Sequence, residues 1–269
     1  MAKTISTGFI SDRVNDIKIN TSMKTNSDNY ESCSKRYIKY IVIHYTGNPK
    51  DTAYANANFF KSPNREASAH FFVDNDNIYQ TVALKYKAWH CGGKKYYHAD
   101  CRISNSIGIE MCCTAGNYKV SAKTITNTAY LTANLCKRLG ISADEVDKYV
   151  LRHYDVTHKS CPAQMANGGK NDSDWIAFKN QVKKILNGNK VSTITTKSVN
   201  YKVEVTVNSL RIRKGAGINY KVLDYIKDKG TYTIVKETQV GNTTWGLLKS
   251  GPIKGSSWIC LTGYTKKVK

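Results

Sequence analysis

The 269-residue sequence has no long apolar run, few acidic residues and no regular cysteine pattern. No apolar segment approaches the roughly 20 residues that a membrane-spanning helix needs, so we expect no membrane span. The first residues lack the apolar core of a secretory signal peptide, and we therefore expect synthesis in the cytoplasm. The eight cysteines show no spacing typical of a disulfide framework, which agrees with a reducing compartment; only a Cys91–Cys101 bridge is left open.

Acidic residues are strongly outnumbered: 20 Asp and Glu stand against 41 Lys and Arg, which gives a formal net charge of +21 at pH 7. The excess extends over both the N-terminal and the C-terminal part of the chain. A charge of this size favours an anionic partner, such as nucleic acid, an anionic membrane surface or an acidic cell wall. Because the sequence has no recognition motif for nucleic acid, we expect no nucleic-acid partner. Charge alone also fits a well-solvated surface.

Residues 151–162, with the sequence LRHYDVTHKSCP, carry the densest group of chemically versatile side chains. His153 and Cys161 lie in this segment, and a neutral imidazole and a thiolate are donors that zinc prefers. A catalytic zinc needs a third protein ligand, which must come from elsewhere in the chain. The segment by itself therefore predicts half of a metal site.

A third ligand is available at the end of a predicted central strand. Residues 37–45 are nearly continuously apolar, as expected of a strand that is covered on both faces. Residues 46–49 contain Gly and Pro and end the strand, so His44 lies where the chain turns towards solvent. A structural core histidine is the alternative. The presence of His153 and Cys161 favours a metal ligand.

A carboxylate interrupts a second apolar strand, predicted over residues 105–113. Side chains alternate along a strand, so Glu110 shares a face with Gly108 and Cys112. A carboxylate in such a strand is rarely left buried and unpaired. Glu110 therefore has either a cationic partner or a catalytic role near a metal, and both interpretations stay open on this argument.

The rest of residues 1–187 alternates between strand and helix patterns. Apolar stripes and capping residues predict helices at 51–61, 124–139 and 172–186, and polar turn residues predict a hairpin over 67–82. The alternation indicates a domain of the α/β class.

The C-terminal part has a different pattern. Residues 188–200 are mostly polar and lose all apolar periodicity, as in a linker. Residues 201–269 consist of short β runs separated by glycines, which predicts a small all-β barrel.

Four fragments in a fixed order carry a family resemblance. They are IHYT at residues 43–46, SAHFFVD at 68–74, NSIGIE at 105–110, and His153 followed by KSCP at 159–162. Together they resemble the zinc-dependent N-acetylmuramoyl-L-alanine amidases, a family that includes phage lysozyme-like amidases and peptidoglycan recognition proteins. The resemblance covers about residues 35–187 and implies a mixed β-sheet with flanking helices.

The resemblance also implies roles for five residues. Zinc would be bound by His44, His153 and Cys161, the last at a position where other members have aspartate. Three protein ligands leave zinc a position for water, and Glu110 would act as the general base that accepts the proton of this water. Lys159 would stabilise the oxyanion at the attacked amide. An ordinary surface lysine is the alternative for Lys159.

Further residues near these fragments complete the predicted site. Trp89 and His90, in a predicted loop over residues 88–93, are candidates for lining the substrate groove. His70, in the predicted hairpin, is interpreted as structural or as a neighbour of the site, not as a ligand. Members that lack the glutamate have a tyrosine where this chain has Ala69, so Ala69 favours the glutamate-using subgroup.

The C-terminal part resembles bacterial SH3-like cell-wall-binding modules, in particular at residues 207–217 and 258–264. Four of its aromatic residues are candidates either for a binding face or for the core: Tyr220, Tyr225, Trp245 and Trp258.

The two resemblances predict a peptidoglycan hydrolase that cuts between N-acetylmuramic acid and L-alanine and is held on the wall by its second domain. The architecture resembles that of phage endolysins, which reach the wall after the membrane has been permeabilised. Peptidoglycan is the expected partner, and anionic wall polymers are a further one. The alternatives are a bacterial autolysin of the same activity and a non-catalytic peptidoglycan-binding protein, which would have no need of zinc ligands.

Overall fold

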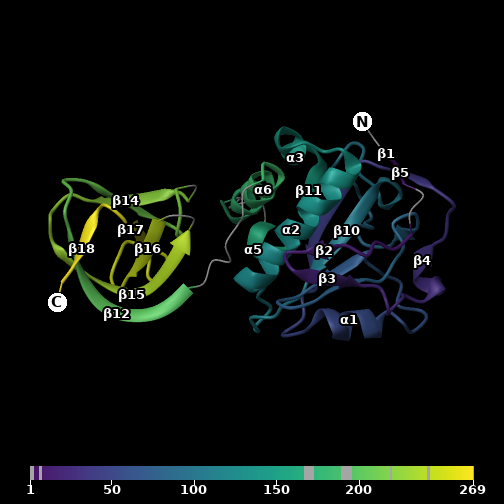
Figure 1. Ribbon diagram of the computed structural model, residues 1–269, viewed down its shortest axis with the longest axis horizontal. Helices are drawn as coiled ribbons and strands as arrows, with labels where there is room; N and C mark the ends of the chain where they lie inside the picture. The colour runs from purple at the N-terminus through teal and green to yellow at the C-terminus, as the bar shows by residue number, and fades with distance from the viewer. Residues whose placement is uncertain are drawn as a thin grey trace. The chain divides into compact units, whose positions relative to one another are not determined.

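The computed structural model describes residues 3–5, 8–166, 173–188, 196–218, 220–240 and 243–268. The chain forms two compact units, residues 1–190 and 191–269, and each has its own seven-stranded sheet (Figure 1). Residues 189–195 of the segment expected to be a linker lie outside the described residues.

The N-terminal unit is built on a mixed sheet, as the sequence predicted. Its strands are β2 (Arg13–Val14), β3 (Ile17–Asn20), β6 (Tyr40–Tyr45), β7 (Phe71–Val73), β8 (Ile78–Gln80), β10 (Ser106–Met111) and β11 (Val150–Arg152). They lie in the order β11-β6-β10-β7-β8-β3-β2. The first four run parallel, β7 and β8 form the predicted antiparallel hairpin, β3 is parallel to β8, and β2 is antiparallel to β3.

Short antiparallel strand pairs also occur among the described residues of this unit. They are β1 (Lys3–Ile5) with β5 (Arg36–Ile38), and β4 (Tyr30–Glu31) with β9 (Lys87–Ala88). The single strand predicted over residues 37–45 is therefore wrong, because it forms parts of β5 and β6. The chain changes partners at Lys39, whose N–H donates to the Asn105 carbonyl at 2.9 Å. A continuous apolar pattern does not reveal such a change of partner.

Helices pack on this sheet (Figure 1). The α-helices are α1 (Ala53–Phe59), α2 (Ala122–Leu139), α3 (Val146–Tyr149), α4 (His153–Thr157), α5 (Ala163–Ala166) and α6 (Ser173–Leu186). Within the described residues, 3-10 turns accompany them: η1 (Ser27–Asn29), η2 (Ile103–Asn105) and η3 (Ala143–Glu145). α2 packs against β10, β7 and β2, and α6 packs against α2. α1 contributes to a core cluster that also contains Phe72 and Tyr79.

The helix ends follow from local hydrogen bonds. α1 begins after Thr52, whose Oγ1 accepts from the Ala55 N–H at 3.1 Å, so Thr52 and not Asp51 is the N-cap. α2 ends at Gly140, which has a left-handed φ of 70° that glycine adopts without steric cost. Within the described ranges, no helix combines the length and the apolar character that crossing a bilayer requires.

The C-terminal unit is a small all-β fold, which confirms the predicted class of this part. Its strands are β12 (Thr196–Val205), β13 (Leu210–Arg213), β14 (Val222–Ile226), β15 (Thr231–Val240), β16 (Thr243–Leu248), β17 (Trp258–Cys260) and β18 (Thr265–Lys267). They pair antiparallel in the order β14-β13-β17-β16-β15-β12-β18. β12 begins at Thr196, inside the segment expected to be a linker.

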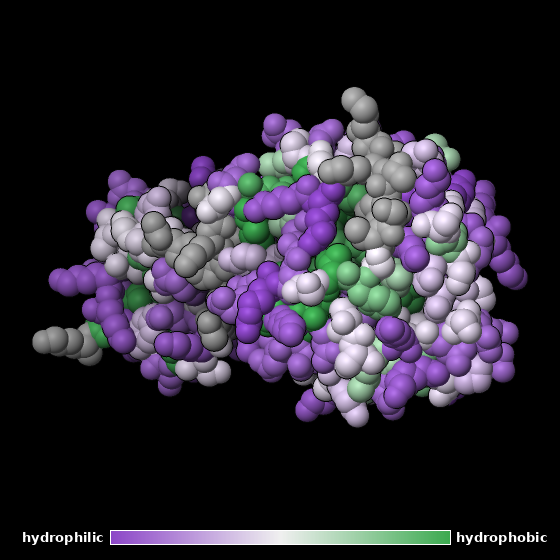
Figure 2. Space-filling model, turned by 45° about the vertical axis from the view of Figure 1, so that its right-hand side comes forward, coloured by the Kyte–Doolittle hydropathy of each residue, from purple (hydrophilic) through white to green (hydrophobic). Residues whose placement is uncertain are grey.

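This antiparallel sheet is curved around one core. Ile226 of the edge strand β14 and Val203 of β12, near the other edge, belong to the same buried cluster. Among the four aromatic candidates, Trp245 is buried, whereas Tyr225 is 44% exposed. Hydrophilic side chains cover much of the molecular face in Figure 2, as expected for a chain with a net charge of +21.

Candidate active site

Three neighbouring parallel strands bring the predicted site residues to one edge of the N-terminal sheet. Glu110 of β10 is opposite His44 of β6, and Arg152 at the end of β11 is opposite Ile43. Residues opposite each other in register share a face of the sheet, so Glu110 and His44 point to the same side. His153 follows Arg152 directly, at the carboxyl end of β11. The carboxyl ends of parallel strands are a common place for ligand binding in α/β proteins.

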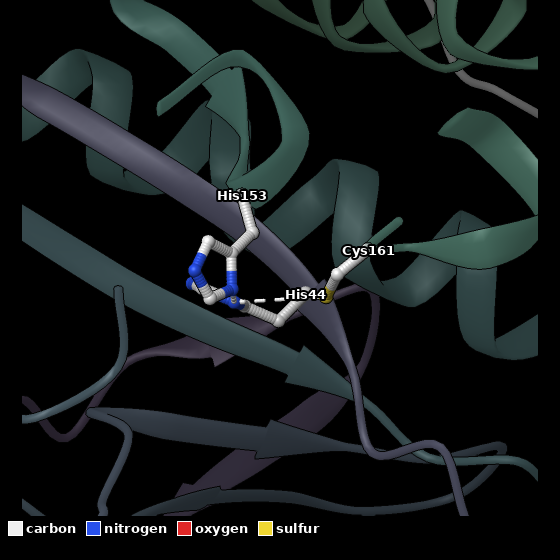
Figure 3. Close-up of side chains that lie close together, drawn as sticks. All are labelled: His44, His153 and Cys161. Atoms are coloured by element: carbon white, nitrogen blue, oxygen red, sulfur yellow. Dashed lines mark hydrogen bonds between the residues drawn. The ribbon is translucent and has the colours of Figure 1, made fainter. Parts of the chain in front are cut away.

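His44, His153 and Cys161 form a compact cluster of potential metal ligands (Figure 3). One donor atom from each residue lies within 4.8 Å of the others. The Nδ1 atom of His44 is 3.1 Å from Nδ1 of His153 and 3.8 Å from Sγ of Cys161. All three side chains are buried. The structure thus brings together the three residues that the sequence indicated as ligands.

A short segment that contains helix α4 connects His153 to Cys161. Helix α4 starts at His153 and is followed by His158, whose φ of 60° is left-handed. The Tyr154 N–H then donates to the Cys161 carbonyl at 3.0 Å and links the ends of this segment. These local contacts place the Cys161 thiol beside the strand that carries His44.

Burial sets the protonation of the cluster. It lowers the pKa of His44 well below the usual value and lowers the pKa of His153 to about 4, so both imidazoles are neutral at pH 7 and each retains a lone pair. Burial also raises the pKa of the Cys161 thiol. The Nε2 atom of His153 is buried without a hydrogen-bond partner among the described residues. Two neutral imidazoles and a thiol are a donor set that can hold a metal of borderline softness.

Glu110 lies beside this cluster with its carboxyl unpaired. Its Oε2 atom is buried and has no hydrogen-bond partner within the described part of the chain. Burial raises the pKa of Glu110 to about 8, against the attraction of Lys159 and together with the repulsion of Asp51. The structure therefore does not support the close ion pair that the sequence left open as the alternative for Glu110.

The raised pKa predicts that Glu110→Gln stabilises the metal-free protein at alkaline pH. The pKa of Glu110 is about 8 in the folded state, against a usual value of 4.5. Between pH 4.5 and pH 8, the carboxyl is therefore protonated in the folded chain and ionised in the unfolded chain. Stability therefore falls as the pH rises through this window and stays lowered above pH 8. With 1.36 kcal/mol per pKa unit, and allowing for water in the pocket, the variant should gain about 2 kcal/mol at pH 9.

Urea unfolding of the two metal-free proteins at pH 4 and pH 9 measures this effect. The variant and the wild type should differ little at pH 4, where the carboxyl is protonated in both states. An equal difference at the two pH values would contradict the raised pKa of Glu110.

The cluster and Glu110 line a pocket of about 700 Å³. Lys159, which is exposed, and Ser160 line the same pocket. An aromatic wall completes it, formed by Phe59, Phe60, Phe72 and Trp89. The sequence argument did not identify Phe59 and Phe60, because helical periodicity shows which residues are apolar and not which of them face a pocket. The available signal in the sequence was two adjacent phenylalanines near the end of the predicted helix. In the structure, Phe59 is 49% exposed.

The other predicted histidines lie behind the cluster. His90 is buried, and its Nδ1 atom is 3.1 Å from Nε2 of His44. It borders the pocket together with Trp89, and its ring nitrogens contact the metal-ligand candidate His44 and the Ser106 hydroxyl. His70 is fully buried and accepts the Gly108 N–H at 3.0 Å through Nδ1. It lies outside the cluster of metal-ligand candidates.

The bridge that the sequence left open between Cys91 and Cys101 is not formed. Both residues are free thiols. They are fully buried, and the two side chains influence each other's pKa. The structure thus places them side by side in the reduced state.

Comparisons with known proteins agree with this arrangement. Residues 34–164 match the model of the N-acetylmuramoyl-L-alanine amidase family. The chain is 32% identical over 188 residues to the N-acetylmuramoyl-L-alanine amidase CwlL of Bacillus licheniformis. The matched segment covers 66% of this chain and 49% of that protein. It is 32% identical over 167 residues to the N-acetylmuramoyl-L-alanine amidase BlyA of Bacillus subtilis (strain 168), with 58% and 44% covered. The chain thus spans about half the length of these curated relatives.

A solved structure extends the similarity to the fold. The solution structure of the PlyG catalytic domain has 25% sequence identity and a TM-score of 0.50, and the match covers 62% of this chain and 94% of that domain. The match to the family model lies in the N-terminal part of the chain. Over residues 34–164, the chain therefore matches the N-acetylmuramoyl-L-alanine amidase family, and it is similar to curated amidases.

Proposed function

We propose that this chain is a zinc-dependent peptidoglycan hydrolase that cleaves the amide bond between N-acetylmuramic acid and L-alanine. The main support is that His44, His153 and Cys161 converge beside the unpaired carboxyl of Glu110 in one pocket. The names of the curated relatives, N-acetylmuramoyl-L-alanine amidases, support the choice of bond. A protein that only binds peptidoglycan would need neither the cluster of donors nor a buried carboxyl next to it.

The donor set suits zinc on chemical grounds. Imidazole nitrogen and thiolate sulfur are typical zinc ligands, and three protein ligands are the usual number in a catalytic site. Zinc held by His44, His153 and Cys161 would supply a Lewis acid for the attacked carbonyl and would lower the pKa of a water molecule. Burial favours the protonated thiol of Cys161, and the positive charge of the ion offsets this preference.

Glu110 is the proposed proton carrier. Its pKa of about 8 refers to the metal-free protein, and a nearby cation lowers the pKa of a carboxyl. A carboxyl whose pKa lies close to the working pH can both accept and return a proton. Glu110 would accept a proton from the attacking water and pass it to the amine of L-alanine as this amine leaves.

Lys159 is proposed to stabilise the negative charge that develops on the attacked carbonyl oxygen. It lines the pocket two residues before Cys161, and its charge opposes protonation of both His44 and Glu110. A charged donor near a developing oxyanion contributes to catalysis because the interaction strengthens in the transition state. Of the two residues expected to line the substrate groove, Trp89 keeps this role in the proposal.

The C-terminal unit is proposed to hold the enzyme on the wall. Its resemblance to SH3-like wall-binding modules and the net charge of +21 of the whole chain support binding to peptidoglycan and to anionic wall polymers. Tyr225 is the aromatic candidate that is available for contact, because it is 44% exposed. Trp245 is buried and belongs to the interior of the unit.

Analysis of the digestion products tests the proposed activity. Purified protein incubated with Gram-positive cell walls should release free amino groups of L-alanine without new reducing sugar ends. A chelator should abolish the release, and added zinc should restore it, because the three donors hold the ion that polarises the amide. Mass spectrometry should show intact stem peptides separated from N-acetylmuramic acid. Reducing ends in place of free L-alanine amino groups would exclude the amidase assignment.

A further inference from the structure

We propose that His90 is a positioning residue that fixes the tautomer and the orientation of the metal ligand His44. The proposal rests on the metal centre described above. It also changes the interpretation of His90, which the sequence suggested as a residue of the substrate groove. The evidence is a chain of hydrogen-bond contacts that runs from Ser106 through His90 to His44.

The chain of hydrogen bonds is best followed from its far end. The Ser106 Oγ atom is 2.7 Å from the backbone carbonyl oxygen of Arg102, which can only accept, so the Ser106 hydroxyl donates there. The Nε2 atom of His90 is 3.3 Å from the same Oγ atom. Because the hydroxyl proton is already used, His90 must donate from Nε2 and Ser106 must accept. A contact of 3.9 Å with the Cys91 thiol uses the remaining acceptor position of Ser106.

The proposed hydrogen bond from His90 to Ser106 then sets the direction of the bond between His90 and His44. A neutral imidazole with its proton on Nε2 has a free lone pair on Nδ1. This Nδ1 atom is 3.1 Å from Nε2 of His44. In the proposed arrangement it accepts the Nε2 proton of His44. The lone pair of His44 is therefore on Nδ1, which is the atom that lies 3.1 Å from Nδ1 of His153 and 3.8 Å from Sγ of Cys161. The chain of bonds thus directs the free lone pair of His44 into the donor cluster.

The packing around His90 maintains this arrangement. A Cβ atom at Gly108 would lie 2.4 Å from Cγ of His90, so the ring can approach strand β10 only because residue 108 is glycine. One face of β10 carries every second residue, namely Ser106, Gly108 and Glu110. The same face therefore contacts His90 and carries the carboxyl of Glu110. The backbone N–H of Trp89 donates to the Ser68 Oγ atom at 2.9 Å and ties down the loop next to His90.

Zinc affinity measures the proposed role without any reference to turnover. His90→Phe keeps an aromatic ring of similar shape and removes the acceptor, so His44 loses the partner that fixes its tautomer. We expect the Kd for zinc, measured on the full chain by competition with a chromogenic chelator, to rise about 10–100-fold, as is typical when the hydrogen-bond partner of a ligating histidine is lost. His90→Asn places an acceptor oxygen near the former Nδ1 atom and should bind zinc within a few-fold of the wild type.

Cobalt binding supplies a spectroscopic readout. Cobalt(II) in the wild type and in His90→Asn should give the same visible absorption bands, whereas His90→Phe should shift or weaken them because the His44 ring is no longer held in one orientation. Circular dichroism and thermal unfolding of the metal-free variants establish whether they are folded. If His90→Phe does not fold, Ser106→Ala breaks the chain one bond further away, and we expect it to weaken zinc binding about 3–10-fold.

The outcomes separate this inference from the proposed function. A folded His90→Phe variant that binds zinc within two-fold of the wild type would overturn the role of His90, and so would unchanged zinc affinity in Ser106→Ala. An increase in KM with unchanged zinc affinity would show that His90 belongs to the substrate groove instead. A wild-type chain that binds no zinc would refute the metal centre itself, and the role of His90 with it.

Discussion

Replacement of Glu110 by glutamine is expected to lower kcat on the order of 10²–10⁴-fold while zinc remains bound. The amide of glutamine has nearly the size of a protonated carboxyl, so the pocket keeps its shape, but the amide cannot accept a proton from water. Turnover of a defined muropeptide and the zinc content of the same sample should be measured together. Retained zinc with lost turnover would locate the defect in proton transfer and not in metal binding.

A matched control for this variant is Glu204→Gln in the C-terminal unit. Glu204 lies on β12 and is exposed, so loss of its charge should leave turnover at the wild-type level. If zinc-loaded Glu110→Gln kept a rate within a few-fold of the wild type, Glu110 would not be the general base. If Glu110→Gln impairs only the chemical step, KM should change much less than kcat.

Replacement of Cys161 by serine is expected to weaken zinc binding on the order of 10³-fold and to abolish the hydrolysis that depends on zinc. A serine hydroxyl is not ionised near neutral pH and is therefore a poor substitute for a thiolate, and His44 and His153 alone do not complete a typical zinc site. Zinc retained after dialysis and the Kd from chelator competition provide the measurement. Activity should disappear in parallel with the metal.

Two further variants control for structural damage. Cys161→Asp places a carboxylate at the ligand position, as in the family members that have aspartate there, and should retain zinc far better than Cys161→Ser. Cys136→Ser alters another fully buried cysteine, on α2 and outside the cluster, and should leave zinc binding unchanged. Equal loss of zinc in Cys161→Ser and Cys136→Ser would indicate general destabilisation and would remove the support for Cys161 as a ligand.

Local patterns predicted most of the elements because they reflect interactions between residues close in sequence. The end of α2 at Gly140 and the hairpin of β7 and β8 depend on nearby capping and turn residues. The errors occur where partners distant in sequence decide the structure. At Lys39 the pairing partner of the chain changes: β5 before it pairs with β1, and β6 after it pairs with β10 and β11. Thr196 belongs to a strand because it pairs with Thr238. Neither event leaves a mark on local apolar periodicity.

The site shows the same division. The residue types and the order of His44, Glu110, His153, Lys159 and Cys161 were sufficient to indicate a family and its chemistry. The unpaired state of Glu110 was not accessible, because a buried carboxylate with an ion-pair partner has the same local sequence. The position of His90 behind His44 was also inaccessible, because it depends on the path of a loop and on the missing side chain at Gly108.

The sequence by itself determined the α/β and all-β classes of the two parts, the resemblance to an amidase family and the identity of the potential ligands. These features are encoded in residue types, short-range spacing and the order of motifs along the chain. Only the tertiary structure decided that the donor atoms of His44, His153 and Cys161 lie within 4.8 Å of one another, that Glu110 Oε2 has no hydrogen-bond partner among the described residues, and that His90 Nδ1 lies 3.1 Å from His44 Nε2. Such distances and hydrogen-bond directions arise from strand register and packing between segments that are far apart in sequence.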